Sequence, residues 1–557
     1  MKDASGFDTD VLIVGAGPVG LTLAMSLAQR GLRATLIEVR PRGAAPDPKC
    51  NHVSSRSMEI FRRLGAASTL RAAGLPDDYP HDVSYRTTIT GREITRIRIP
   101  GRADRFTDRS GPDGWWPTPE PPHRVNQRYL EPILVEHAAA MDGVQLLNRT
   151  RVDGFVQDAD GVTVQAMQLD REQPLRLRAR FLAGCDGGRS MVRKAIGARL
   201  VGDDVIQRVQ SSFIRAPDLI GRMQAAPAWG LFSFNPRRSG VMYAIDGREL
   251  WLVHNYLRDD EADFDSVDRD WALRTILGVG SDFKYELLSK EDWYGRRLVA
   301  DRFREQRAYL CGDAAHLWVP YAGYGMNAGI ADADNLAWHL AGVLKGWAGP
   351  AALDAYACER QAITEQVSRF AMDHAHAMAK RRRDVPEGME ADGPEGERLR
   401  AEVGRELYEL NVQQYCCAGL NFGYYYDSSP VIAYDDAQAP AYSMGSFTPS
   451  TVPGCRVPHF WLRDGRSLYD AFGSDYTLLR TDSDIDVSSL LQAAAQRGMP
   501  VTLLNLQGEA LPPEYQHKLL LCRCDQHVAW RGNAVPTQAL ALMDQLRGAA
   551  LSQETRP

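Results

Sequence analysis

A glycine-rich turn lies between the first apolar run of the chain and the first predicted helix. Its sequence, Gly15-Ala16-Gly17-Pro18-Val19-Gly20, has the spacing Gly-x-Gly-x-x-Gly and follows the apolar residues 11–14. Glycines at this spacing allow backbone N–H groups and the positive end of a helix dipole to approach a pyrophosphate. The turn predicts a dinucleotide site, but alone it does not say which dinucleotide binds. The expected contacts are Gly15, Gly17, Pro18, Val19 and Gly20, together with Glu38, Val39 and Arg40 at the end of the next strand, where an acidic side chain can hold an adenosine ribose.

Two acidic motifs follow further along the chain. Asp186 and Gly187 lie in Cys185-Asp186-Gly187-Gly188-Arg189-Ser190, and Asp313 lies in Cys311-Gly312-Asp313-Ala314-Ala315-His316. A carboxylate such as Asp313 can accept a hydrogen bond from a sugar-like hydroxyl, and a helix start near Gly325 can offer backbone donors to developing negative charge. The alternative for Asp313 is a helix cap, since Asp is a preferred N-cap residue.

In this order the three motifs resemble those of the class A flavoprotein monooxygenases, the single-component aromatic hydroxylases. The resemblance implies FAD as the cofactor. Segments 355–360, 453–459 and 525–531 extend it to the larger phenol, hydroxybiphenyl and polyketide hydroxylases, which carry a C-terminal thioredoxin-like domain. One departure is Ala322, where members often have a glycine. The cofactor contacts carried over are Arg56, Gln127, Asp186, Gly187, Asp313, Pro320, Gly323, Gly325, Met326 and Asn327.

The resemblance also implies a reaction. NADH or NADPH reduces FAD, O₂ forms a flavin C4a-hydroperoxide, and an oxygen atom is transferred to a phenolic or related aromatic ring. A base near the phenol would help, and His52 is the candidate because His titrates near neutral pH and this loop precedes Arg56. Pro320 is a candidate backbone contact at the same centre. Two alternatives stay open: epoxidation or Baeyer–Villiger oxidation of a polyketide or antibiotic scaffold, and a flavin-binding interaction protein without catalysis.

Particular elements are needed to position these residues. Residues 11–38 read as strand, helix and strand, which is typical of a parallel sheet. Alternating residues near 161–178 and over 211–299 predict further strands. The expected fold class is α/β: a Rossmann-type, GR2-like FAD-binding domain with an inserted β-sheet substrate domain and a C-terminal thioredoxin-like domain.

The expected domain boundaries follow from these segments. The FAD-binding domain is discontinuous, covering residues 1–200 and 296–385, and the middle β-sheet substrate domain covers 201–295 with part of 70–125. A helical or linker segment, 386–455, then leads to the thioredoxin-like domain, 456–550. Strand alternation places Cys522 and Cys524 on one face with the wrong spacing for a redox dithiol, so no redox chemistry is expected there.

Composition narrows the classes of partner. A formal charge of -6 over 557 residues argues against nucleic acid, and no apolar run approaches the roughly 20 residues of a membrane span. Nine cysteines scattered through the chain, with no signal-peptide pattern, predict a reduced cytoplasmic protein. We expect no metal site. The sequence leaves open a homodimer, the choice of NADH or NADPH, and the identity of the aromatic substrate.

Overall fold

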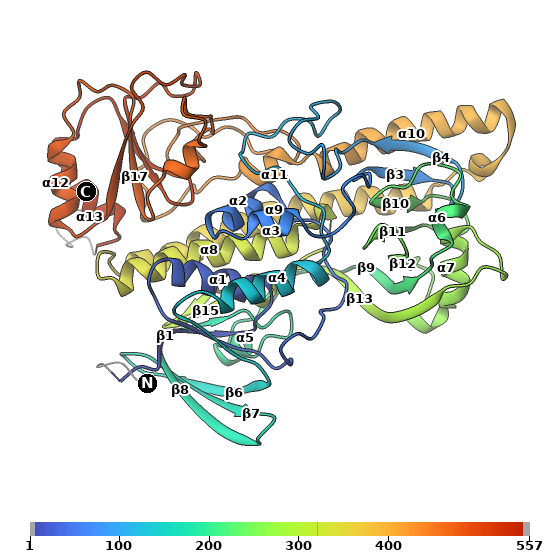
Figure 1. The fold of residues 1–557 in the computed structure, drawn as a ribbon, viewed down its shortest axis with the longest axis horizontal. Helices are drawn as coiled ribbons and strands as arrows, with labels where there is room; N and C mark the ends of the chain where they lie inside the picture. Colours follow the sequence, from blue (N-terminus) through green and yellow to red (C-terminus); the bar gives the residue numbers. More distant parts are fainter. Residues whose placement is uncertain (1–5, 320, 550–557) are drawn as a thin grey trace.

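Three β-sheets and their helices make up the computed structural model, which describes residues 6–319 and 321–549. In Figure 1 the C-terminal domain lies at one end, the N-terminal sheet with its helices lies below the centre, and a large second sheet lies at the other end. The predicted α/β fold class is confirmed. Pro320, predicted as a cofactor and reaction-centre contact, lies outside the described residues.

The first sheet is parallel at its centre, with the order β14-β15-β8-β1-β2-β5. The glycine turn follows its central strand, because Val14 of β1 pairs with both Ile37 of β2 and Gly184 of β8. A meander of β6 and β7 extends from β8. The strands are β1 (Thr9–Val14), β2 (Ala34–Ile37), β5 (Val144–Leu147), β6 (Thr150–Gln157), β7 (Val162–Gln168), β8 (Gln173–Gly184), β14 (Arg304–Glu305) and β15 (Ala308–Leu310).

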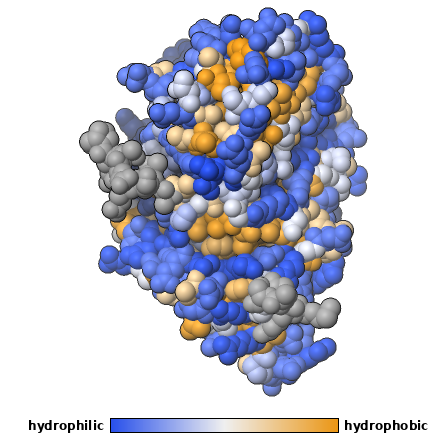
Figure 2. Space-filling model, turned by 90° about the vertical axis from the view of Figure 1, so that its left-hand side faces the viewer, coloured by the Kyte–Doolittle hydropathy of each residue, from blue (hydrophilic) through white to orange (hydrophobic). Residues whose placement is uncertain are grey.

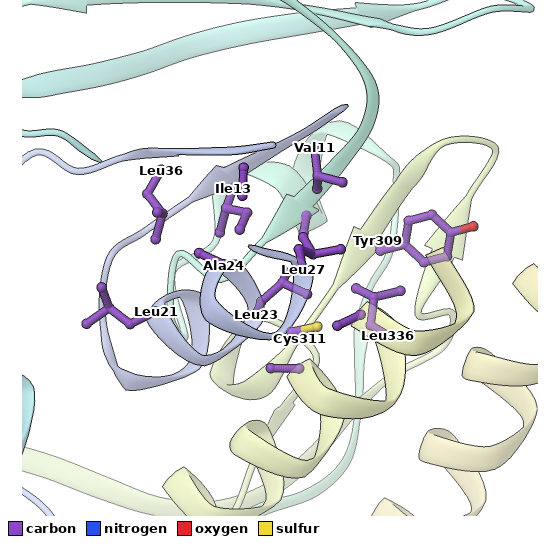
Figure 3. Packing of buried hydrophobic residues seen from close by; sticks show 14 of the residues in the cluster. Val11, Ile13, Leu21, Leu23, Ala24, Leu27, Leu36, Tyr309, Cys311 and Leu336 are labelled. Carbon is purple, nitrogen blue, oxygen red and sulfur yellow. The ribbon is translucent and has the colours of Figure 1, made fainter. Parts of the chain in front are cut away.

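Helix α1 packs between the first sheet and helix α8. Figure 3 shows its Leu23, Ala24 and Leu27 between strand residues such as Val11 and Leu336 of α8, all fully buried. Apolar residues on both faces of α1 permit this two-sided packing, which fixes the helix start beside the carboxyl end of β1. The helices of this part are α1 (Pro18–Gln29), α2 (Ser55–Arg63), α3 (Ala67–Arg71), α4 (Gln127–Ala139), α5 (Met191–Ala195) and α8 (Tyr324–Leu344).

The second sheet has the order β16-β13-β9-β12-β11-β10-β3-β4. Its last two strands come from the segment before residue 100, so loops of the first part lie directly against it. Its members are β3 (Val83–Arg86), β4 (Glu93–Ile97), β9 (Leu200–Arg215), β10 (Gly230–Ser233), β11 (Gly240–Ala244), β12 (Leu250–Tyr256), β13 (Glu286–Ala300) and β16 (His316–Leu317). Its helices are α6 (Leu219–Arg222) and α7 (Arg269–Leu277), and the long α9 (Ala351–Arg383) and α10 (Gly393–Tyr415) pack against it.

The C-terminal domain is built on a four-stranded sheet of order β18-β17-β19-β20. Strands β17 and β18 are parallel and the others antiparallel, in agreement with the thioredoxin-like expectation. Figure 2 views this end of the molecule and shows hydrophilic residues over much of the surface with apolar patches between them. The elements are α11 (Ala418–Phe422), which precedes the domain, β17 (Tyr476–Arg480), α12 (Ser488–Gln496), β18 (Val501–Asn505), β19 (Leu519–Arg523), β20 (Val528–Gly532) and α13 (Ala539–Leu546).

Two cysteines of this domain depart from the sequence expectation. Cys522 and Cys524 were expected on one face of a strand, but they belong to different hydrophobic clusters. The reason is that β19 ends at Arg523 and the chain then turns, with Gln526 at φ 65°. Cys524 instead contacts Arg30 of the N-terminal part, at 3.3 Å from Sγ to Nη2.

In the described ranges, 6–319 and 321–549, no helix is long and apolar enough to cross a membrane. Within the same ranges, no group of three or more His, Cys, Asp or Glu side chains is arranged to hold a metal ion.

Candidate active site

The three glycines of the N-terminal turn have different structural roles. Gly15 has φ 101°, and a Cβ there would lie 2.4 Å from the carbonyl oxygen of Cys185. A Cβ on Gly20 would lie 2.1 Å from the carbonyl oxygen of Gly15. A Cβ on Gly17, the N-cap of α1, would have no protein atom within 4 Å, and no side-chain hydrogen bond caps the helix. Two glycines therefore permit close packing, while the third leaves the helix start open to an anion.

A chain of side chains connects this turn to α4. Glu38 accepts hydrogen bonds from the backbone N–H groups of Ala16 and Arg40, at 2.8 and 2.9 Å. Arg40 bridges Glu38 to Glu131, and Gln127 donates to the same Glu131 at 3.1 Å. Burial alone would raise the pKa of Glu38, but the bonds from Arg40 outweigh it and lower the pKa. The structure thus brings together three predicted contacts through Glu131, which sequence reasoning missed; Val39 beside them is exposed.

Asp186 has a structural role in addition to its predicted place at the cofactor. Its carboxylate accepts from Ser190 Oγ at 2.6 Å and from the backbone N–H of Met191 at 2.6 Å, so it organises the start of α5. Gly187 follows at φ 75°. Arg193 then donates to the carbonyl oxygens of Gly188 and Ala314, which ties this motif to the one around Asp313.

Close packing places the Asp313 motif beside the glycine turn. A Cβ on Gly312 would meet Val19 Cγ2 at 3.0 Å, and one on Gly329 would meet the same atom at 2.6 Å. Val19 therefore occupies a space left by two glycines. Asp313 is exposed, and its carboxylate accepts no hydrogen bond within the described part of the chain. The densely packed protein around it nevertheless raises its pKa by desolvation.

A buried ion network beneath this motif was not predicted. Asp332 of α8 accepts from the backbone N–H of Gly312 at 3.1 Å, from His316 Nε2 at 2.7 Å and from Arg360 Nε at 2.7 Å. All the side-chain partners are at most 2% exposed. His316 packs within the turn and is 1% exposed. No spacing in a single sequence connects an aspartate of one helix with an arginine of the next.

Asn327 ties the loop that contains His52 to the start of α8. Its Oδ1 accepts from Ser54 N–H and Ser57 Oγ at 2.8 and 2.7 Å, and its Nδ2 donates to the carbonyl oxygens of His52 and Gly323 at 3.0 and 2.6 Å. A Cβ on Gly323, at φ 60°, would lie 3.0 Å from His52 Cβ. The left-handed backbone and the asparagine together fix His52 against the segment that leads to Gly325 and Met326.

A second loop holds the opposite side of His52. Val53 and His123 form an isolated antiparallel bridge, with N–H to O distances of 2.8 and 2.9 Å. Their neighbours His52 and Arg124 are consequently adjacent, and Arg124 Nη1 contacts His52 Nδ1. Because a guanidinium only donates, Nδ1 is the acceptor and the proton of neutral His52 resides on Nε2. Burial and then the positive charges of Arg124 and Arg105 lower the pKa of His52 well below its ordinary value. This geometry opposes the base role predicted for His52.

Arg56 contacts the C-terminal domain. Its guanidinium contacts Glu59 and Gln526 and donates to the carbonyl oxygen of Asp525 at 3.0 Å. It is only 4% exposed. Arg56 therefore fastens α2 to the C-terminal domain, because the chain after β19 turns onto this helix. Its flavin contact stays a prediction.

An aromatic cluster of the second sheet lies next to Arg124. The guanidinium carbon of Arg124 stands 4.3 Å from the centre of the Trp229 ring, and Trp229 packs against Tyr243 and Tyr415. Tyr321, from the turn before α8, receives a hydrogen bond from Arg382 at 3.0 Å. Five tyrosines here act electrostatically on one another, and we name them the tyrosine cluster: Tyr85, Tyr243, Tyr256, Tyr321 and Tyr415.

The residues present fit an FAD molecule. Gly17 leaves an open approach to an uncapped helix start, suited to a pyrophosphate, and Asp313 presents a free carboxylate suited to a ribityl hydroxyl. Both lie around Val19, so one extended dinucleotide can reach them.

Comparison with known proteins agrees with this geometry. The family description "FAD binding domain" matches residues 8–371, and "Aromatic-ring hydroxylase, C-terminal" matches residues 450–550. The chain belongs to the FAD-dependent aromatic-ring hydroxylases. It is 31% identical to the FAD-dependent monooxygenase apdD of Emericella nidulans, over 95% of this chain and 88% of that one. It is 30% identical to phenol 2-monooxygenase of a Pseudomonas species, over 98% and 93% of the two chains.

Comparison with a solved structure extends the likeness to the whole fold. The rebeccamycin biosynthetic enzyme RebC with reduced flavin superposes with a TM-score of 0.87 at 33% identity, covering 98% of this chain and 99% of that one. As a member of the family, this hydroxylase is an FAD-dependent monooxygenase, and the cofactor implied by the glycine turn is FAD.

Proposed function

We propose that this hydroxylase inserts one oxygen atom of O₂ into a phenolic ring, with NADH or NADPH as the electron donor. The substrate would lie between the His52 loop and the second sheet. The observation that supports this is the Arg124 guanidinium, which lies on the Trp229 ring and contacts His52. Since Asn327 of α8 holds the His52 loop, this contact joins the start of α8 to the aromatic residues of the second sheet. Aromatic surroundings with few polar groups suit a planar ring.

Each part of the site has a separate task in this proposal. The N-terminal turn and Asp313 would hold FAD, which when reduced and bound would supply activated oxygen for the substrate. Asn327 and Gly323 fix the His52 loop against the start of α8. His52, with its proton on Nε2, donates a hydrogen bond to the phenolic oxygen rather than removing its proton. Buried side chains of the tyrosine cluster exclude water from the reaction.

The test uses the purified FAD-loaded protein. Oxidation of NADH and of NADPH is followed with O₂ uptake across a panel of phenols and their methyl ethers, and products are identified by mass spectrometry under ¹⁸O₂. We expect a phenol to accelerate coenzyme oxidation, and its product to contain one labelled oxygen. If no aromatic compound in the panel accelerates oxidation, or if the new oxygen comes from water, the proposal is wrong.

A further inference from the structure

Arg124 is a buried cation without a carboxylate partner. It is 3% exposed, and within the described residues its one hydrogen-bond contact is His52 Nδ1 and its one ring contact is Trp229. A guanidinium has five N–H donors, so this arginine retains donors that no protein acceptor uses. Burying a cation without a partner is costly, and that cost lowers the pKa of Arg124 by desolvation.

The nearby charges do not provide a counter-ion. Asp113 is the carboxylate that acts electrostatically on Arg124, but its Oδ2 is paired with Arg105 and its Oδ1 accepts from Trp116 Nε1 at 2.9 Å. Arg105 is itself buried, with Nε and Nη2 lacking partners within the described ranges. Two buried guanidinium groups thus face one carboxylate, which leaves an excess positive charge beside His52.

Two phenolic hydroxyls of the tyrosine cluster are also unpartnered. Tyr85 OH and Tyr415 OH are buried and have no hydrogen-bond partner in the part of the chain that the structure describes. Tyr415 packs edge-on against Trp229, the ring on which Arg124 lies, at 6.2 Å between centres. Buried polar groups are ordinarily hydrogen-bonded. The unpaired donors of Arg124 and Tyr415 therefore belong to residues that pack on the same ring, Trp229, and Tyr85 acts electrostatically on Tyr415.

We infer that Arg124 binds an anionic oxygen of the aromatic substrate, either a phenolate or a carboxylate, and thereby selects substrates that carry one. A planar guanidinium suits such an oxygen, and the bond is charge-assisted. If the oxygen is phenolate, Arg124 stabilises the ionised and electron-rich form of the ring, so no protein base is required at His52. This inference rests on the proposed function and adds the property of the substrate that the site recognises.

The test measures binding of three probes to the oxidised, FAD-loaded protein without NADH or NADPH. The probes are 2-naphthol, 2-naphthoate and the neutral 2-methoxynaphthalene, and binding is followed by ligand fluorescence. In Arg124→Met we expect the affinity for an anionic probe to fall about 10- to 100-fold, with that for the ether nearly unchanged. Arg124→Lys should restore part of the loss. Preference for 2-naphthol identifies a phenolate site, and preference for 2-naphthoate identifies a carboxylate site.

A matched control is Arg128→Met, which removes a half-buried cation stacked on Phe213 four residues along the chain. It should leave all three affinities near those of the wild type. Equal loss of the ether and the anionic probes in Arg124→Met would overturn the inference, as would a wild type that prefers the ether. Loss of bound FAD in Arg124→Met without a selective loss of anionic probes would overturn it as well. This assay measures binding and not turnover, so its result does not depend on whether the protein hydroxylates the probes. Failure of the proposed hydroxylation would appear only in the turnover assay.

Discussion

Arg523 of β19 and Glu359 of α9 form a bidentate ion pair between the C-terminal domain and the FAD-binding part, at 2.5 and 2.9 Å. Both side chains are 0% exposed. Asn335 and Ser429 donate to the same carboxylate, and Asp525 pairs with the same arginine. Burial would raise the pKa of Glu359, but the charge of Arg523 lowers it. The two domains are therefore joined by a fully desolvated electrostatic contact within a buried network of polar side chains.

Replacing Arg523 with Met should destabilise the folded protein by roughly 3–5 kcal/mol, because Glu359 would remain as a buried charge without a cation. Urea unfolding followed by intrinsic fluorescence measures the change. Arg497→Met, which breaks a surface pair with Asp544, is the control and should have little effect. Similar unfolding curves for both variants would show that the buried pair contributes no more than the surface pair.

Replacing Gly17 with Ala should impair FAD binding while leaving the fold intact. The new Cβ would meet nothing within 4 Å of protein, but it would project where the pyrophosphate approaches. We expect FAD affinity to fall about tenfold or more, equivalent to about 1.4 kcal/mol. Flavin fluorescence titration of the apoprotein measures it. Gly154→Ala in β6, also without a neighbour within 4 Å, should bind FAD normally. Tight flavin binding by Gly17→Ala would contradict the assignment of the turn.

Asn327→Ala should loosen His52 and slow substrate-dependent turnover. The change leaves Ser54 N–H and Ser57 Oγ without their acceptor, and a buried donor of this kind costs about 1–3 kcal/mol. Steady-state kinetics with a phenol and thermal unfolding are compared with Asn421→Ala, another buried asparagine, which bonds within its own helix region. Equal effects of the two changes on kcat would remove the special role of Asn327.

Stability should fall as the pH decreases below about 6.5, earlier than carboxylates alone would require. Burial lowers the pKa of His123 to about 3 and that of His374 to about 4. In the unfolded chain a histidine has a pKa of about 6.5. Above that pH both states are neutral at these positions. Below it the unfolded state binds protons that the folded state excludes, so stability is lost as the pH falls towards about 4.

His374→Gln isolates this contribution. It should reduce the slope of unfolding free energy against pH by up to about 1.4 kcal/mol per pH unit between about pH 6 and 4.5. Urea unfolding at several pH values measures the slope. His376→Gln changes an exposed residue two positions along α9 and controls for the substitution itself. An unaltered slope in His374→Gln would show that this residue is protonated equally in both states.

The sequence predicted the cofactor end of this site better than the substrate end. Gly15, Glu38 and Asp313 follow strands of one sheet, and local spacing suffices to predict where such residues lie. Arg124 could not be predicted, because its position depends on a bridge between Val53 and His123 that joins two long loops. No periodic pattern connects those loops.

Arg56 also shows that contacts with a distant part of the chain are not predicted by local sequence. Its sequence neighbourhood resembled a flavin contact, yet its partners are Glu59 and the carbonyl oxygen of Asp525. A helix can be predicted from its own residues, whereas the surface that covers it is contributed by a distant domain. Glu131 was missed for a related reason: its importance arises only when α4 lies beside the strand that ends before Glu38.

The position of β15 in the first sheet has a consequence for how this protein is made. The strand pairs in parallel with β8, although most of the second sheet lies between them in the chain. A nascent polypeptide that has emerged only as far as β8 has its glycine turn, but neither Asp313 nor the helix that packs Val19 in place. Flavin capture must therefore wait until α8 has left the ribosome. Bound flavin consequently reports on a chain synthesised at least as far as Leu344, and N-terminal fragments that end before α8 should accumulate colourless.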